Sequence, residues 1–198
     1  GRMGEILDRM LAVLKPGTVV TDVGSVKGSV VRELEPMVAA AGGQFVGSHP
    51  MAGAEKTGPG AARADLFVKA ICVVTPTRRT SSRVVSQIET LWQAVGGIPL
   101  RLDPDEHDAL VSRSSHLPHV VAAALAQAVL DPAHRKAQAR LCATGFRDTT
   151  RIASSSPEMW RDIALANAEN LSRALGELMA GLRGFRRAWK AGEGEAVR

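Results

Sequence analysis

Residues 18–28 read TVVTDVGSVKG, and this stretch decides the fold of the first half of the chain. Its first six residues, Thr18 to Val23, are mostly β-branched, which is typical of a buried parallel strand. Residues 24–28 predict a tight turn from strand to helix, and residues 29–41 predict the helix that follows. A second strand pattern begins at Gln44. The order of strand, helix and strand indicates a parallel sheet with covering helices.

The same architecture extends in both directions from this stretch. Residues 5–14 carry apolar side chains at helical spacing, and residues 82–94 form an amphipathic pattern. Residues 71–75 predict a further buried strand, and residues 98–102 predict an edge strand because Pro99 lacks a backbone donor. We therefore expect an α/β domain with part of a Rossmann fold and a parallel sheet over residues 1–102.

The character of the sequence changes after Asp103, where strand patterns stop. We expect a second domain over residues 103–198 that is entirely helical. Its expected helices cover residues 105–113, 116–130, 132–143, 157–166 and 168–190.

Composition excludes several classes of protein. The chain has 198 residues, 45% of them hydrophobic and 23% charged, which is ordinary for a globular protein. Its net charge of +5 suits small anionic ligands, whereas 4% aromatic residues and no Tyr leave few platforms for stacking bases. We therefore expect no nucleic-acid partner. No apolar run reaches about 18 residues, so no membrane span is expected. Two isolated cysteines predict neither a metal site nor a disulfide framework, and the cytoplasm is the expected compartment.

Residues 47–53 read GSHPMAG and contain the first candidate for chemistry. We expect a short strand to end at Val46, because Pro50 cannot continue a sheet ladder. His49 would then stand where a strand stops and a loop begins, and open α/β sheets bind ligands at such strand ends. Histidine is also the side chain best suited to accept a proton near neutral pH. The alternative is a histidine that only caps a loop.

Four polar stretches together resemble the prephenate dehydrogenase family, which includes the arogenate and cyclohexadienyl dehydrogenases. They read TDVGSVK (residues 21–27), SHPMAG (48–53), SHLPH (115–119) and GFRDTTRIA (145–153). Each phrase alone is weak, but they occur in the family's order and approximate spacing over about residues 17–162.

The resemblance implies an NAD- or NADP-dependent oxidative decarboxylation of prephenate to 4-hydroxyphenylpyruvate, in tyrosine biosynthesis. The 4-hydroxyl loses its proton, C4 gives a hydride to the cofactor, and carbon dioxide leaves as the ring becomes aromatic. His49 is at the position of the family's catalytic base. Ser25 stands at a neighbouring strand end, where its hydroxyl either orients the imidazole or caps the following helix.

The resemblance also suggests which residues bind substrate and cofactor. A guanidinium grips a carboxylate with two parallel bonds, so Arg151 fits the ring carboxylate; the alternative is a surface ion pair with Asp148 or Glu55. His107 and Asp108 either tune the site or cap a helix. The remaining substrate contacts are expected from His119, Gly145, Ser115 and Met51, and the cofactor contacts from Asp22, Gly24 and Ser25.

Some questions stay open at the level of the sequence. Family members carry a Gly-rich dinucleotide loop, and no Gly-x-Gly-x-x-Gly occurs in this chain. NAD and NADP are not distinguished, nor are prephenate and arogenate. The alternatives are a non-catalytic dimerisation fragment, or another Rossmann dehydrogenase with a helical second domain. The latter would need a catalytic Lys on a Gly-rich helix, and no convincing one is found.

The helical half predicts a homodimer. Residues 116–130 are apolar nearly all round, and residues 168–190 carry an apolar stripe. A domain of about 95 residues buries only part of its surface alone, and two-fold pairing is the commonest solution. The alternative is a monomer whose helices pack against the α/β half.

Overall fold

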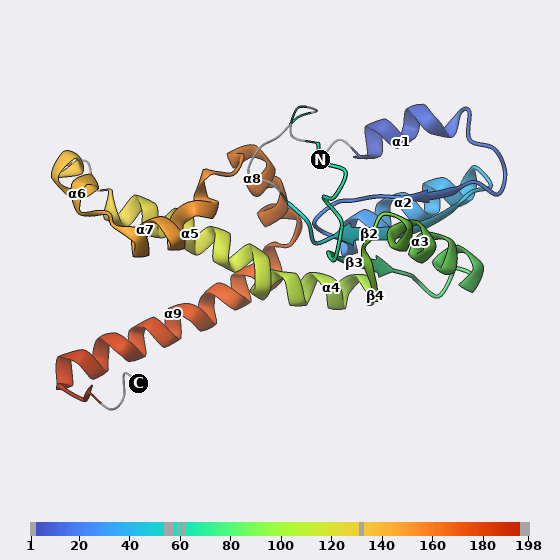
Figure 1. The fold of residues 1–198 in the computed structure, drawn as a ribbon. Helices are drawn as coiled ribbons and strands as arrows, with labels where there is room; N and C mark the ends of the chain where they lie inside the picture. The colour runs from blue at the N-terminus through green and yellow to red at the C-terminus, as the bar shows by residue number, and fades with distance from the viewer. Residues whose placement is uncertain (1–2, 54–57, 59, 61, 131–132, 195–198) are drawn as a thin grey trace. The chain divides into compact units, whose positions relative to one another are not determined.

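The computed structural model describes residues 3–53, 58, 60, 62–130 and 133–194. The chain divides into two compact units (Figure 1). The first comprises residues 1–110 and 155–166, and the second comprises residues 111–154 and 167–198. Each unit has its own secondary structure and its own packing.

The first unit is built on a four-stranded sheet with the strand order β1-β2-β3-β4. The strands are β1 (Val19–Thr21), β2 (Gln44–Pro50), β3 (Ile71–Thr75) and β4 (Ile98–Arg101). β1 pairs with β2 and β3 with β4 in parallel, whereas β2 and β3 run antiparallel. The α/β class is therefore confirmed, with a mainly parallel sheet and one antiparallel pair, and β4 with Pro99 is an edge strand of this sheet.

β2 is longer than the sequence predicted, and the expected strand end at Val46 is wrong. Pro50 lies within the strand opposite Cys72. Met51 donates its backbone N–H to the Ile71 carbonyl over 2.7 Å. Bonded and non-bonded pairs alternate along an antiparallel ladder, so Pro50 occupies a position whose missing N–H would not face β3. Proline is tolerated there, and His49 is consequently a strand residue.

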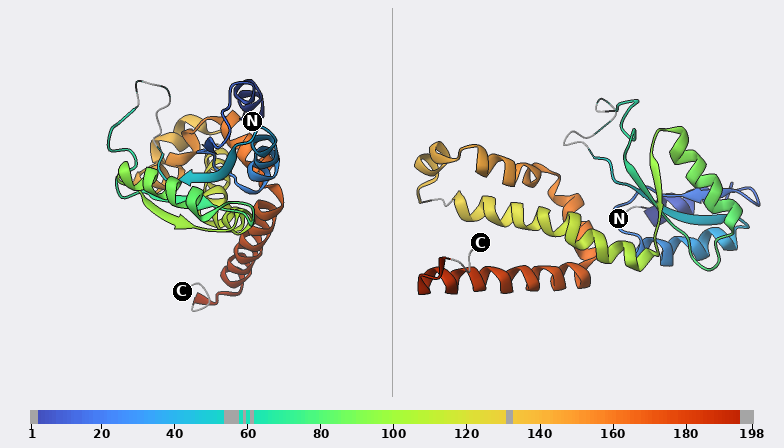
Figure 2. Two further views of the ribbon diagram at one scale, coloured as in Figure 1. Left: turned by 90° about the vertical axis from the view of Figure 1, so that its right-hand side faces the viewer. Right: turned by 60° about the horizontal axis from the view of Figure 1, so that its bottom comes forward.

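Helices cover both faces of this sheet (Figures 1 and 2). Side chains alternate between the two faces of a strand, so neighbouring residues of β2 enter different cores. Phe45 packs with α1 (Met3–Leu11) and α2 (Gly28–Ala40), in a cluster with Leu7, Val31, Leu34 and Val38. Val46 packs with α3 (Ser82–Ala94), in a cluster with Cys72, Val74, Val84, Val85, Ile88 and Trp92.

Two further helices belong to the first unit, α4 (Pro104–Val111) and α8 (Pro157–Ala166). The last residue of α4, Val111, is already counted in the second unit. The second unit is helical, as expected. Its elements are the π-helical turn η2 (Ser112–His116), α5 (Leu117–Val129), α6 (Arg135–Leu141), α7 (Thr144–Thr150), the 3-10 turn η3 (Arg151–Ser154) and the 24-residue α9 (Ala168–Ala191).

Within the second unit, α5 packs against α7, η3 and α9. The sequence did not predict α7, and the helix expected to begin at residue 116 begins after the π turn. The helix expected over residues 132–143 is α6, although Pro132 itself lies outside the described residues. Across the described ranges, every helix is too short or too polar to cross a lipid bilayer.

Candidate active site

The turn that follows β1 is closed by the carboxylate of Asp22. It accepts the backbone N–H of Gly24 over 2.8 Å, and across the sheet it accepts the N–H of Ser48 over 3.1 Å. The same carboxylate forms an ion pair with Lys27. Asp22 therefore ties the turn at the carboxyl end of β1 to the strand that carries His49.

Lys27 is fully buried, with no exposed side-chain surface. Its amine also donates to the Ser48 carbonyl over 2.8 Å. Burial lowers the pKa of Lys27 from its ordinary value, against the opposing effect of Asp22. Gly47 leaves the room that Lys27 needs, because a Cβ there would lie 3.3 Å from Cδ of Lys27 and 2.5 Å from Oγ1 of Thr75.

The Ser48 side chain lies on the face of β2 opposite to that of Gly47, and two neighbours hold it there. Its hydroxyl lies 2.8 Å from that of Thr21, and the indole N–H of Trp92 donates to it over 3.2 Å. Backbone and side chain of Ser48 are thus both anchored. The residue that follows it in the strand, His49, is held on a rigid support.

His49 is the first member of a chain of three buried side chains. Its Nδ1 lies 2.8 Å from Nε2 of His107, and Nδ1 of His107 lies 2.8 Å from Oδ1 of Asp108. The two rings meet edge-on, at an interplanar angle of 73°. His107 and Asp108 come from α4, so the sheet and this helix jointly position the imidazole of His49.

Asp108 connects this chain to α2. Its carboxylate accepts the backbone N–H groups of Lys27 over 2.7 Å and of Gly28 over 2.8 Å. Burial alone would raise the pKa of Asp108, but the bonds from His107 and from these two N–H groups outweigh it and lower the pKa. Asp108 caps a helix, although not its own, and His107 contacts His49.

Ser25 lies half-buried in the turn, and neither expected contact of its hydroxyl is present. The N-cap position of α2 is Lys27, without a side-chain cap, and Asp108 takes the place of a local cap. In the described part of the chain, Nδ1 of His49 shares its hydrogen bond with Nε2 of His107, and no hydrogen bond joins it to Ser25.

The turn that follows β1 is partly open to solvent. Val23 is 61% exposed, and Gly24 and Ser25 are half-buried beside it. They lie at the carboxyl end of β1, where open α/β sheets bind ligands. The Asp22 carboxylate is almost fully buried and holds the turn through its bonds to Gly24 and Ser48. The chain carries no Gly-rich motif for the pyrophosphate.

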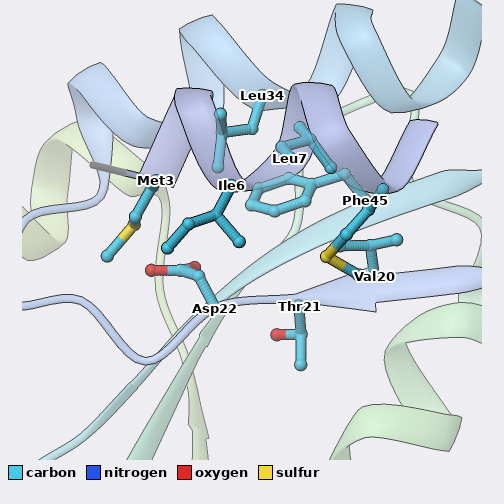
Figure 3. Close-up of a pocket in the computed structure, with 9 residues that line it drawn as sticks. Met3, Ile6, Leu7, Val20, Thr21, Asp22, Leu34 and Phe45 are labelled. Carbon is cyan, nitrogen blue, oxygen red and sulfur yellow. The ribbon is translucent and has the colours of Figure 1, made fainter. Parts of the chain in front are cut away.

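An apolar pocket of about 160 Å³ lies next to this turn (Figure 3). Its wall comes from α1, α2, β1 and β2, with Thr21 and Asp22 as its polar members. Figure 3 shows Met3 and Ile6 of α1 near the Asp22 side chain. The apolar lining residues are Met3, Ile6, Leu7, Met10, Val20, Leu34 and Phe45.

The expected substrate residues divide between the two units. Met51 is in the first unit with His49, and it is 39% exposed. In the second unit, Nδ1 of His119 donates to the Ser115 carbonyl over 3.0 Å, and burial lowers the pKa of His119. Gly145 lies in α7, and Arg151 is exposed at the start of η3. Glu55, the alternative partner of Arg151, lies outside the described residues.

Sequence reasoning missed the polar network beneath His49. Thr21 and Ser48 are polar residues inside otherwise apolar strands, and that pattern was an available signal. A buried polar side chain needs a hydrogen-bond partner, which predicts a network rather than an ordinary core. Lys27 occurs in the TDVGSVK phrase, and nothing local to it in the sequence indicates burial.

The first unit has the organisation of a Rossmann-like nucleotide-binding domain, and the chain continues into a helical domain. Comparison with known families agrees with both parts. The nucleotide-binding domain of prephenate dehydrogenase matches residues 1–99, and the dimerization domain of prephenate dehydrogenase matches residues 103–197. The chain belongs to the prephenate dehydrogenase family.

Two curated relatives illustrate the similarity. The prephenate dehydrogenase of Bacillus subtilis is 42% identical over 158 residues, which cover 77% of this chain and 41% of that protein. The cyclohexadienyl dehydrogenase of Zymomonas mobilis is 35% identical over 195 residues, which cover 98% of this chain and 66% of that protein. The chain thus spans less than two thirds of the length of these relatives.

Solved structures give the same result. Prephenate dehydrogenase from A. aeolicus, in complex with hydroxyphenyl propionate and NAD+, superposes with a TM-score of 0.89 at 35% identity. The match covers 99% of this chain and 68% of that one. Synechocystis arogenate dehydrogenase superposes with a TM-score of 0.83 at 29% identity, covering 98% of this chain and 69% of that one.

Proposed function

We propose that the protein containing this chain is an NAD- or NADP-dependent dehydrogenase that oxidatively decarboxylates prephenate or arogenate. The observation that carries the proposal is the buried chain from His49 through His107 to Asp108. It provides an oriented imidazole on a strand of a nucleotide-binding domain. The family match, and the NAD+ complex of the A. aeolicus relative, support the choice of cofactor.

His49 acts as the general base in this proposal. It accepts the proton of the substrate's 4-hydroxyl as the ring loses carbon dioxide and becomes aromatic. The nicotinamide cofactor, when bound, supplies the acceptor for the hydride that leaves C4. The contacts of Asp22, Lys27 and Ser48 hold β2, the strand that carries His49, in place. The imidazole therefore needs little reorientation when the proton moves.

The helical unit supplies the substrate contacts. Arg151 is proposed to hold the ring carboxylate through paired N–H bonds, with His119, Ser115 and Gly145 as further contacts from this unit. Met51 is the substrate contact proposed from the α/β unit. The lowered pKa of His119 favours its neutral form near pH 7. A neutral imidazole recognises a polar group by hydrogen bonding and does not compete with Arg151 for the carboxylate.

We propose that the protein is a homodimer formed through the helical unit. α5 is almost wholly apolar, yet within one chain only Ala122 of its described residues is buried. On α9, apolar side chains remain exposed along the carboxyl-terminal half, at Met179, Leu182, Phe185 and Trp189. A second copy that covers these helices removes that surface from water. The family name of this region, a dimerization domain, supports the assignment.

The expected compartment is a reducing one, the cytoplasm. Cys72 is buried in the sheet and Cys142 is half-buried in the helical unit, and both are free thiols. Thiols that never pair are typical of proteins that fold under reducing conditions.

The proposal is tested by assaying the whole protein with prephenate and arogenate, each with NAD+ and NADP+. Reduced cofactor and the aromatic product should appear together in one of the four combinations. The same assay separates the alternatives, because a non-catalytic fragment gives no signal with any combination. Cofactor reduction with a simple hydroxy acid, and none with either cyclohexadiene, would place the protein in another class of dehydrogenase.

A further inference from the structure

The direction of the hydrogen bonds in the His49 chain is fixed at its Asp108 end. Two backbone N–H groups already donate to this carboxylate, and its pKa lies below the ordinary value, so it is ionised near neutral pH. An ionised carboxylate only accepts hydrogen bonds. The proton between Asp108 and His107 must therefore be carried by Nδ1 of His107.

The orientation then passes to His49. A neutral histidine has one N–H and one acceptor nitrogen, so His107 with its proton on Nδ1 presents Nε2 as an acceptor. That nitrogen lies 2.8 Å from Nδ1 of His49. Nδ1 of His49 must accordingly donate, and the basic lone pair of the neutral ring is left on Nε2.

We propose that His107 and Asp108 are positioning residues that hold His49 in the tautomer with its proton on Nδ1, so that Nε2 accepts the substrate proton. This inference deepens the proposed function, because it rests on His49 being the base. His107 and Asp108 act only through His49 and need not touch the substrate.

The arrangement has two chemical consequences. The other tautomer places a proton on Nε2, where the substrate hydroxyl must deliver its own, and it cannot act as a base from that atom. After the transfer, His49 is an imidazolium, and the ionised Asp108 stabilises its charge through the intervening ring of His107. The Asp108 carboxylate both selects the tautomer of His49 and stabilises the imidazolium, and it keeps its bonds to Lys27 and Gly28 throughout.

The tautomer can be observed directly by ¹⁵N NMR of the protein labelled at histidine, with His49→Asn used to assign the signals. We expect a pyrrole-type shift at Nδ1 and a pyridine-type shift at Nε2 of His49 near neutral pH. The reverse pattern, or averaged shifts at both nitrogens, would overturn the proposal. This measurement needs no turnover, so it remains decisive if the protein does not oxidise prephenate and the proposed function itself fails.

A matched pair of variants tests the functional link. His107→Gln keeps an oxygen that can accept from Nδ1 of His49, whereas Met has nearly the same shape as Gln and only a weakly accepting sulfur. We expect His107→Met to lower kcat by about 10²-fold with KM little changed, and His107→Gln to recover most of that loss. The exposed His134, changed to Met, serves as a control outside the site.

The outcome that contradicts the link is equally clear. If His107→Gln and His107→Met lose the same activity while the signals of His49 keep their wild-type tautomer in both, orientation by His107 is irrelevant. A loss of folding in His107→Met is recognised by circular dichroism, and the NMR measurement on the unsubstituted protein then decides alone.

Discussion

His49 lies inside β2, so its backbone is constrained by pairing with β3 as well as by the proline behind it. Changing it to Asn keeps a polar side chain of similar size and removes the basic nitrogen. We expect His49→Asn to lower kcat by about 10²–10⁴-fold with a much smaller effect on KM, because loss of a general base affects the chemical step. Steady-state kinetics with prephenate and the preferred cofactor measure both parameters.

A variant at an exposed histidine shows whether the effect is specific. His134→Asn lies outside the first unit and should leave kcat and KM as they are. If His49→Asn retains wild-type kcat, His49 is not part of the chemistry and another base must be sought.

Arg151 is the residue expected to hold the ring carboxylate. Removing one charge-assisted pair costs about 1.5–3 kcal/mol, or roughly 10–150-fold in KM. We therefore expect Arg151→Ala to raise KM for prephenate while kcat changes less. Arg140→Ala, at an exposed position of α6, is the matched control. Arg151 does not bind the ring carboxylate if the variant keeps the wild-type KM for prephenate and also the wild-type activity on an analogue that lacks this carboxylate.

Single residues were predictable from sequence where the signal is local. His49 stands in a short phrase with Pro50 and Gly53, and such a phrase can be recognised without knowing the fold. Its contact with His107 joins residues 58 positions apart, and no local property of either residue encodes that approach. Ser25 was the expected partner of His49, because it is nearer in the predicted topology.

At the level of elements, α2 depends on a carboxylate from α4. Asp108 accepts two N–H groups at the start of α2, where a helix otherwise leaves its donors unpaired. Its pKa is lower in the folded chain than its ordinary value of about 3.9. The stabilisation is thus complete above that ordinary value and is lost as the pH falls through the folded pKa.

We expect Asp108→Asn to lower the free energy of unfolding by about 1–3 kcal/mol at pH 7, because one buried N–H then faces an amide N–H. The difference from the wild type should shrink as the pH falls from 5 towards 2, where the wild-type carboxyl also becomes neutral. Urea titrations at several pH values measure this.

Asp105→Asn is the comparison for this titration series. Asp105 forms an exposed ion pair with Arg32, and such pairs contribute little to stability. A difference between wild type and Asp108→Asn that stays constant from pH 7 to pH 2 would show that the ionised carboxylate does not stabilise α2.

Elements were predictable where pattern and capping agree. α3 begins and ends where expected, since its apolar face is continuous and Ser81 caps its first turn. The predicted strand at β2 was too short. The sequence shows that Pro50 lacks an N–H donor, but it does not show that the strand pairs antiparallel with β3 at a position where no donor is needed. α7 was missed because Thr and Gly are weak helix formers, and it packs on α5.

At the level of the whole molecule, the helical unit has more apolar surface than it hides. We expect sedimentation equilibrium at micromolar concentration to give a mass of about two chains of 20.9 kDa. Leu182→Glu places a charge on the exposed stripe of α9, and we expect it to shift the equilibrium towards single chains.

Val13→Glu is the control for the dimer, because Val13 is equally apolar and well exposed but belongs to the α/β unit. It should leave the mass unchanged. A single-chain mass without concentration dependence would contradict the dimer outright, and dissociation by both variants alike would place the interface elsewhere.

The change from an α/β part to a helical part was predictable, because strand patterns end near residue 103. The boundary itself, between residues 102 and 103, remains a prediction. That α4 and α8 belong to the compact unit of the sheet was not predictable, since helical periodicity shows which face is apolar but not which neighbour covers it. A sequence pattern of this kind therefore gives the class of each part before it gives the partners of each helix.

Trp92 gives the first unit an optical property of its own. Its indole is buried, and its N–H donates to the hydroxyl of Ser48, the residue that precedes the proposed base. Trp189, by contrast, is 65% exposed at the far end of α9. Indole fluorescence depends on exposure to water and on the bond made by the N–H. A protein in which Trp160 and Trp189 are replaced by Phe would emit from Trp92 alone. A movement of β2 during ligand binding would then shift the wavelength of its fluorescence emission.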